Sequence, residues 1–345
     1  MHSRHARAVV LPDPSCHPQR WIGFMTALGA LLDCRPVIFV AGDPHLDLLS
    51  AGRESLARYY DFAIPPRAAL ELLQDKRSQY QWLERGGVDL PGTRMPASEA
   101  EAVHAAGSLG FPCLAKPAVS HRWNRRIVEK AIVIGAPGQA AEAYRAMDAS
   151  GCGCVIQEIV EGGDDHFFGA LCCFSRGGEP LAAMTKKKLR QYPERFGNGS
   201  VQVSVDLPEL SARSCAILRR LDCAGFGTIE YKLDPADGKM KLIEINPRLV
   251  SGLQLAVDSG CDLPWISYCD LAGLPREESA AQKIGVLFMN EAWELRRVMK
   301  RRSLREWIGY GATLARARSF ASLSLTDPGP ACSLVRRALT QGFAV

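Results

Sequence analysis

The chain has 345 residues, of which 47% are hydrophobic and 23% are charged. This length exceeds that of a typical single domain, so we expect two or three packed units with a substantial apolar core. The composition excludes fibrous, low-complexity and intrinsically disordered proteins. The formal net charge of +5 is weaker than the footprint of a nucleic-acid-binding domain, which favours an anionic small molecule as the partner.

Apolar segments that would direct the chain to a membrane are short. The run at residues 8–11 ends at Pro12, too early for a secretory signal, and the stretch at residues 23–32 reaches about half of the ~20 residues that a membrane-spanning helix needs. We therefore expect a cytoplasmic protein that does not enter a membrane. Most of the 12 cysteines then fit reduced, buried thiols.

The first 65 residues predict a small α/β unit. A helical apolar pattern over residues 18–32 precedes a buried-type strand at residues 37–40, and a second helix follows over residues 46–59. A short extended segment then leads to Pro65-Pro66, where we place a boundary.

Short strands dominate the middle of the chain. Helices are predicted over residues 68–86, 97–109 and 209–221. Segments of apolar or alternating character between Gly, Pro and Asp turns predict strands at residues 113–117, 130–134, 154–159, 167–174, 180–185, 227–234 and 239–246. From residue 262 onward the pattern is mainly helical and closes with a helix over residues 332–340.

The strongest chemical signal is the hairpin formed by the last two strands. If Asp234 faces Met240, Glu230 lies directly opposite Glu244. On the other face, Ile229, Tyr231 and Leu233 would then lie opposite Ile245, Ile243 and Lys241. Directly opposed carboxylates repel each other, so a cation should lie between them.

Asn246 shares the face of the two carboxylates through the alternation of a strand, and such a set of oxygen ligands suits Mg²⁺. Arg248 follows at once and is placed to offer a bidentate contact to a phosphate or carboxylate. The alternative is an exposed hairpin whose glutamates are solvated and paired with Lys232 or Lys241.

Glu230 and the run Leu242-Ile243-Glu244-Ile245-Asn246-Pro247-Arg248 resemble the metal-binding strands of the ATP-grasp superfamily. Other segments follow in the family's order: Asp75-Lys76, Leu114-Ala115-Lys116-Pro117, Ile156-Gln157-Glu158-Ile159-Val160-Glu161-Gly162, and Lys188-Leu189-Arg190-Gln191-Tyr192-Pro193 with Gly197. The resemblance runs from about residue 36 to 275 and is closest to the D-aspartate ligase-like carboxylate-amine ligases.

The resemblance implies an α/β (α+β) protein with the ATP-grasp fold, in which two lobes hold a nucleotide. The ATP-grasp domain would span residues 66–275, with a small lobe at about 108–156 and a large lobe at about 157–275. A shortened Rossmann-like unit at residues 1–65 would precede it, and a helical C-terminal extension at residues 276–345 would follow.

The resemblance also implies ATP and Mg²⁺ as cofactors, with Mn²⁺ as an alternative metal. Lys76 and Lys116 would contact the phosphates. The backbone around Glu158, Ile159 and Val160 would read the adenine edge, and Gln157 beside them would also belong to the cofactor site. Glu161 or Asp165 would accept hydrogen bonds from the ribose, with Asp164 as an open alternative, and the metal ligands would be Glu230, Glu244 and Asn246.

Three basic residues would act on the reacting groups. Lys188 and Arg190 would contact the γ-phosphate or the substrate carboxylate, unless they belong to a solvated loop, and Arg248 would stabilise charge on the transferring phosphoryl group. The loop at residues 118–126 lacks the glycines that many ATP-grasp lids contain.

The implied activity is that of an ATP-dependent carboxylate-amine ligase, which forms an acyl phosphate and releases ADP and phosphate. Its partners would be a small-molecule carboxylate and an amine, without nucleic acid, and a homodimer is compatible with this activity. Positioning and electrostatics carry such chemistry, in agreement with the lack of a Ser/His or Cys/His signature. The alternatives are an ATP-grasp enzyme with a non-amine acceptor and a catalytically silent ATP-binding regulator.

Overall fold

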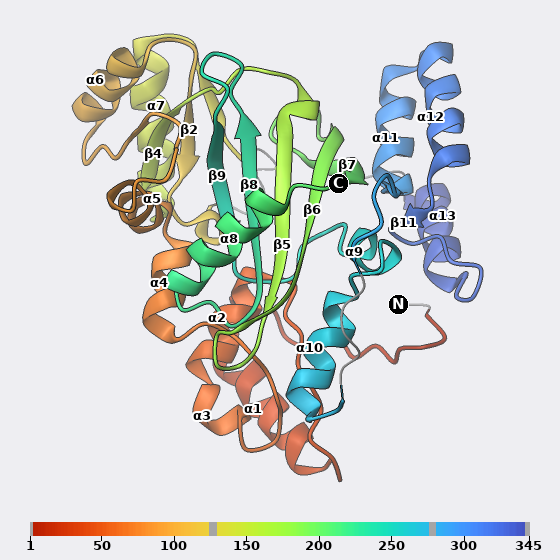
Figure 1. Cartoon of the computed structure of the whole chain (residues 1–345). Coiled ribbons are helices and arrows are strands. Elements are labelled where there is room, and N and C mark those ends of the chain that lie inside the picture. Colours follow the sequence, from red (N-terminus) through yellow and green to blue (C-terminus); the bar gives the residue numbers. More distant parts are fainter. Residues whose placement is uncertain (1–2, 124–129, 276–280, 342–345) are drawn as a thin grey trace.

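The structure is a computed structural model that describes residues 3–123, 130–275 and 281–341 (Figure 1). Two β-sheets form its centre and helices pack around them, so the expected mixed α/β class is confirmed. Residues 124–126 of the expected lid loop lie outside the described residues. None of the helices in the described part of the chain combines the length and apolarity needed to cross a membrane.

The N-terminal unit consists of α1 (Pro18–Ala30), α2 (Asp43–Ala51) and α3 (Arg53–Leu56). The strand expected at residues 37–40 is reduced to a parallel bridge between Val37 and Asp61. The carbonyl of Val40 instead accepts a hydrogen bond from the backbone N–H of Leu249, at 3.2 Å, just beyond the end of β9 (Met240–Asn246). The helix expected over residues 46–59 is interrupted at Gly52, because glycine disfavours a helix interior.

The small sheet has the order β1-β4-β2-β3, formed by β1 (Thr93–Arg94), β4 (Cys154–Glu158), β2 (Cys113–Pro117) and β3 (Ile132–Ile134). Two helices, α6 (Glu99–Leu109) and α7 (Pro137–Ala149), pack against its outer face (Figure 1). The sequence analysis did not predict α7. Its signal was present, because the buried Ala140, Ala143 and Met147 follow helical spacing.

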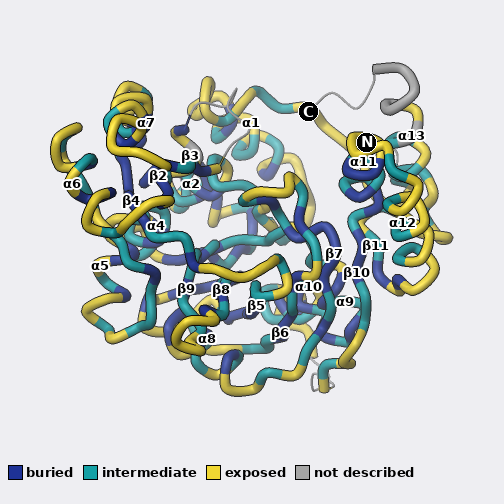
Figure 2. The backbone as a smooth tube through the Cα atoms, turned by 90° about the horizontal axis from the view of Figure 1, so that it is seen from above, coloured by how far each residue is buried: buried dark blue, intermediate teal, exposed yellow. Residues whose placement is uncertain are grey.

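The large sheet has the order β11-β10-β7-β6-β5-β8-β9. Its strands are β5 (Phe167–Phe174), β6 (Pro180–Tyr192), β7 (Asn198–Ser204), β8 (Gly225–Leu233), β9 (Met240–Asn246), β10 (Leu287–Met289) and β11 (Ser319–Phe320). The expected strand at residues 180–185 continues to Tyr192, and β7 was not predicted. Strands β5, β7 and β8 are mostly buried, whereas most residues of β6 and β9 are only partly buried or exposed (Figure 2).

Alternation along the strands of the large sheet gives its two faces different neighbours. Cys172 and Phe174 of β5 share a core with α8 (Pro208–Arg220), whereas Leu171 and Cys173 share a core with α9 (Gln254–Asp258) and α10 (Leu263–Ala272). Glu230 of β8 lies on the second face, since its neighbours Ile229 and Tyr231 lie in the α8 core. Helices α9 and α10 cover only part of that face, and the rest lines a cavity.

Helices α4 (Arg67–Gln74) and α5 (Lys76–Arg85) connect the N-terminal unit to the small sheet, and α5 begins at Lys76 after the N-cap residue Asp75, as expected. The C-terminal part is largely helical, with α11 (Glu291–Arg301), α12 (Leu304–Arg316) and α13 (Gly329–Gln341). It also contributes β10 and β11, which extend the large sheet.

Replacement of Ile229 by alanine is expected to lower the free energy of unfolding by about 2–5 kcal/mol, because its fully buried side chain fills the core between β8 and α8. Urea unfolding followed by circular dichroism measures this change. Leu325→Ala is the control: Leu325 is fully exposed, so its replacement should change stability by less than about 0.5 kcal/mol. Equal stability of both variants would contradict this packing.

Candidate functional site

A cavity of about 970 Å³ lies between the small and the large sheet, next to the N-terminal unit. Its basic side chains are Lys76, Lys116, Lys130, Lys186, Lys188, Lys232 and Arg248. Its acidic side chains are Asp43, Glu158, Glu230 and Glu244. Among the residues that the structure describes, cations therefore outnumber carboxylates in the lining by seven to four, which favours a polyanionic ligand.

The β8–β9 hairpin brings two of these carboxylates face to face. Glu230 pairs with Glu244 and Thr228 with Asn246, which confirms the predicted register at this end of the hairpin. Beyond Glu230 the register shifts by one residue, so the expected pairing of Asp234 with Met240 is wrong, and Leu233 lies opposite Met240. The expected partners of the other residues change in the same way: Tyr231 faces Leu242 instead of Ile243, and Leu233 no longer faces Lys241.

A β-bulge at Ile243 causes this shift. Two residues of β9 oppose one residue of β8 there, and the freed carbonyl of Ile243 accepts a hydrogen bond from the buried hydroxyl of Tyr80 at 2.6 Å. The bulge therefore serves a second purpose, because it joins the hairpin to α5, the helix that begins with Lys76.

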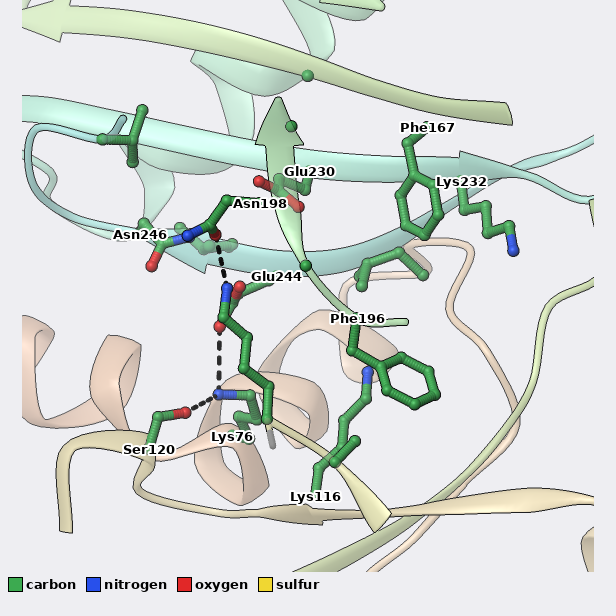
Figure 3. Close-up of a pocket in the computed structure, with 18 of the residues that line it drawn as sticks. Lys76, Lys116, Ser120, Phe167, Phe196, Asn198, Glu230, Lys232, Glu244 and Asn246 are labelled. Atoms are coloured by element: carbon green, nitrogen blue, oxygen red, sulfur yellow. Dashed lines mark hydrogen bonds and ion pairs between the residues drawn. The ribbon is translucent and has the colours of Figure 1, made fainter. Parts of the chain in front are cut away.

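Glu230, Glu244 and Asn246 point into the cavity from β8 and β9 (Figure 3). The Lys76 ammonium lies 3.3 Å from a carboxylate oxygen of Glu244 and donates to the Ser120 hydroxyl at 2.6 Å. Burial alone would raise the pKa of Glu244, but the nearby charges of Lys76, Lys130 and Lys116 outweigh burial and lower it to about 2. Glu244 is therefore ionised at neutral pH.

This donor set fits a hard divalent cation. Among the described residues, no hydrogen bond or ion pair reaches the Glu230 carboxylate, although the directly opposed Glu244 repels it. The same part of the chain contains no cluster of three or more His, Cys, Asp or Glu arranged for a metal. An ion here would thus depend on both carboxylates, on the amide oxygen of Asn246 and on oxygens from a ligand, as Mg²⁺ commonly does with phosphates.

Lys116 lies on the small sheet across the cavity. Its ammonium donates to Gln157 at 2.6 Å, and Gln157 in turn donates to Thr93 at 2.9 Å, so the contacts cross three strands. Burial and the neighbouring Lys76 lower the pKa of Lys116 to about 8, although Glu244 and Glu230 oppose this change. Burial likewise lowers the pKa of Lys186, on the large sheet, to about 8.

The segment predicted to hold adenine lies at the junction of the sheets. Gln157, Glu158, Ile159 and Val160 all line the cavity. Lys241 bridges Glu158 at 2.8 Å and Asp234 at 2.6 Å, which ties β4 to the hairpin. Lys232 donates to the Val160 carbonyl at 2.7 Å.

The residues predicted to bind the ribose do not line the cavity. Asp165 pairs with His166 at 3.1 Å, and Glu161 is exposed. The open alternative, Asp164, accepts a hydrogen bond from the backbone N–H of Gln191 at 3.0 Å.

The structure separates Lys188 from Arg190. Lys188 lines the cavity, whereas Arg190 lies 3.0 Å from Glu294 and donates to Thr313 at 2.7 Å, on the C-terminal helices. The physical reason is the register shift between them in β6, which interrupts the alternation, so that Gln191 faces the cavity instead.

Arg248 lines the cavity at the end of the hairpin, where Asp43 of α2 forms a bidentate ion pair with its guanidinium. Sequence reasoning missed Asp43, although an acidic residue directly after an expected strand is a recognisable signal. It also missed Ser120, Lys130, Lys186 and Lys232 as cavity residues. Lys232 and Lys186 could have been found from alternation, because they share parity with Glu230 and Lys188.

Comparison with known proteins agrees with this architecture. A family model described as "ATP-grasp in the biosynthetic pathway with Ter operon" matches residues 171–292. No curated protein sequence matches the chain.

Solved structures resemble much more of the chain. Biotin carboxylase from Campylobacter jejuni superposes with a TM-score of 0.61 at 16% identity, over 77% of this chain and 60% of that one. The biotin carboxylase domain of 2-oxoglutarate carboxylase from Hydrogenobacter thermophilus has a TM-score of 0.62 at 15% identity, over 81% and 62%. N5-carboxyaminoimidazole ribonucleotide synthetase from Thermus thermophilus has a TM-score of 0.56 at 16% identity, over 75% and 67%.

These likenesses define the class: the chain has the ATP-grasp fold. The expected resemblance to the ATP-grasp superfamily is confirmed, whereas the closeness to D-aspartate ligase-like enzymes stays a prediction. The chain spans about 60% of the length of the biotin carboxylase structures that it matches.

Affinity for a nucleotide is expected to decline as the pH rises through about 8, because Lys116 and Lys186 lose their charges there. One lost charge-assisted contact should weaken ATP binding by about tenfold or more between pH 7.5 and 9.5, as isothermal titration calorimetry would measure. Lys116→Arg keeps its charge over this range and should flatten the decline. A constant wild-type affinity would contradict a role of these ammonium groups.

Proposed function

We propose that the chain is an ATP-dependent carboxylate-amine ligase that works through an acyl phosphate. The observation that carries the proposal is the pair Glu230 and Glu244, directly opposed beside Asn246 at the end of a lysine-rich cavity between two ATP-grasp sheets. This arrangement suits a polyanionic nucleotide with a divalent cation. The similar biotin carboxylase domain of 2-oxoglutarate carboxylase was solved with ADP, its magnesium salt and bicarbonate.

In this proposal Glu230, Glu244 and Asn246 hold Mg²⁺, which when bound neutralises charge on the nucleotide phosphates. Lys116 and Lys76 approach the phosphates from the small-sheet side of the cavity, and Lys186 and Lys188 from the large sheet. Lys76 would exchange its contact with Glu244 for a phosphate oxygen. These residues position the reactants and stabilise charge, and none of them forms a covalent intermediate.

The proposed reaction has two steps. A carboxylate oxygen of the substrate attacks the γ-phosphorus of ATP, and ADP leaves from the opposite side. The nitrogen of the amine then attacks the acyl carbon, phosphate leaves, and the nitrogen releases a proton as the amide forms. The dense positive charge of the cavity favours both the phosphoryl group and an anionic acid.

A second candidate keeps the first step and changes the acceptor. The structural neighbours include biotin carboxylases, which supports an ATP-grasp enzyme with a non-amine acceptor as the alternative. A catalytically silent ATP-binding regulator is disfavoured, because Glu230, Glu244 and Asn246 are all present with hairpin geometry suited to a metal.

The deciding experiment combines purified protein, Mg·ATP, pools of carboxylic acids and hydroxylamine as a surrogate amine. A hydroxamate found by mass spectrometry, together with stoichiometric ADP, would establish acyl-phosphate formation and identify the acid. Replacement of hydroxylamine by pools of amines would then identify the acceptor. ADP release that needs bicarbonate and gives no hydroxamate would favour the second candidate.

Glu244→Gln is expected to reduce ADP formation by at least about 100-fold, because an amide cannot supply the anionic ligand that the metal needs. The matched control is Glu179→Gln, which removes an exposed carboxylate paired with Arg219 and should leave turnover unchanged. Coupled spectrophotometric detection of ADP gives both rates, and circular dichroism checks the folds. Normal turnover in Glu244→Gln would disprove the metal assignment.

A further inference from the structure

Most hydrogen-bond donors of Arg248 are already in use. A guanidinium has five N–H groups. Nε and Nη2 form the bidentate pair with Asp43, Nη2 also donates to Oδ1 of Asn246 at 3.2 Å, and Nη1 donates to the Leu249 carbonyl at 3.2 Å. One N–H group, on Nη1, is left for a ligand. The forked edge that the sequence analysis assigned to a phosphate or carboxylate faces Asp43 instead.

Asp43 belongs to another part of the chain, since it is the first residue of α2 in the N-terminal unit. Its neighbours Ala41 and Pro44 also line the cavity. The backbone reinforces this junction, because the N–H of Leu249 donates to the carbonyl of Val40 at 3.2 Å. The N-terminal unit thus contacts the end of the cavity that holds the expected metal ligands, both through a side chain and through the backbone.

We propose that Asp43 is a positioning residue of the metal site, which acts on Asn246 through Arg248. The inference rests on the proposed function, since that function assigns the metal to Glu230, Glu244 and Asn246. Arg248 orients the amide of Asn246 by donating to its oxygen, and an amide oxygen has a second lone pair with which it could bind a metal. Asp43 holds the guanidinium in the position that this contact requires.

Asp43 also balances charge. The guanidinium of Arg248 lies within hydrogen-bonding distance of an expected metal ligand, where an uncompensated positive charge would repel a divalent cation. The carboxylate of Asp43 compensates it at short range. Replacement of Asp43 should therefore weaken the binding of the metal without weakening the binding of metal-free nucleotide.

The test measures the affinity for ATP with Mg²⁺ and with EDTA, in the full chain, by isothermal titration calorimetry. The ratio of the two affinities is the gain that the metal provides. Asp43→Asn is expected to lower this gain by about 10-fold or more, because replacement of a residue that orients a metal ligand commonly weakens metal binding by this factor. The affinity for ATP in EDTA should not be reduced. Asp43→Glu keeps the charge and should recover part of the gain.

A matched control exists in the same unit. Asp61 pairs with Arg35 at 3.2 Å and with Arg176 at 2.6 Å, so it joins the N-terminal unit to the turn between β5 and β6, and it does not line the cavity. Asp61→Asn should leave the metal gain unchanged. An equal loss in Asp61→Asn and Asp43→Asn would show a general structural effect and overturn the inference.

A second comparison tests whether the effect passes through Arg248. In the Arg248→Met background, Asp43→Asn should cause no further loss of metal gain. A loss of the same size in both backgrounds would exclude action through Arg248.

The readout needs no turnover, so it separates the inference from the proposed function. If the wild-type protein forms no hydroxamate but the Asp43→Asn variant loses the metal gain, the ligase proposal is refuted and the positioning role of Asp43 is kept. A wild-type metal gain in Asp43→Asn would overturn the positioning role whatever the enzyme catalyses.

Discussion

The site depends on the register of β8 and β9, which holds Glu230 directly opposite Glu244. Two carboxylates at this separation repel each other and would weaken the hairpin unless cations compensate them. Lys76 supplies part of the compensation to Glu244, and no described side chain pairs with Glu230. The Glu230 carboxylate faces a cavity whose described lining is otherwise rich in lysine, which leaves one place in a positive environment where another cation is favoured.

The lysines of the cavity also lack sufficient compensation for their charge, which in their case is positive. Burial lowers the pKa of Lys116 and Lys186 to about 8, which means that their charges are costly without a partner. A polyanion accompanied by a divalent cation satisfies both groups at once, because phosphates pair with the ammonium groups and the cation pairs with the carboxylates. Under the proposed function, this reciprocity would account for the presence of both signs of charge in the cavity.

The sequence alone predicts correctly which residues share a face wherever the two-residue alternation of a strand is unbroken. Glu244 and Asn246 of β9 are an example, since alternation alone places them on one face. The facing of Glu230 and Glu244 was predicted from a register that is wrong at the turn: with Leu233 opposite Met240, unbroken pairing would put Glu230 opposite Ile243, and the bulge at Ile243 restores the predicted pair. Prediction from alternation failed at β-bulges, because an extra residue reverses the face of the residues that follow it in the strand. Ile243 is such a residue in β9, and the register shift between Lys188 and Arg190 has the same effect in β6. The sequence analysis also missed Asp43, whose contact with Arg248 joins residues 205 positions apart and depends on how the N-terminal unit docks.

The two arginines that the sequence analysis grouped as catalytic show how tertiary contacts divide similar residues. Arg190 meets the fully buried Glu294, which also accepts from Ser200 and Arg297, so it anchors α11 to the large sheet. Arg248 meets Asp43 at the cavity and touches Asn246. The carboxylate of Glu294 is buried and that of Asp43 is partly exposed, and each holds the guanidinium of its own arginine in place. The C-terminal helices thus support β6, the strand that carries Lys186 and Lys188, while the N-terminal unit supports the end of the hairpin that carries the expected metal ligands.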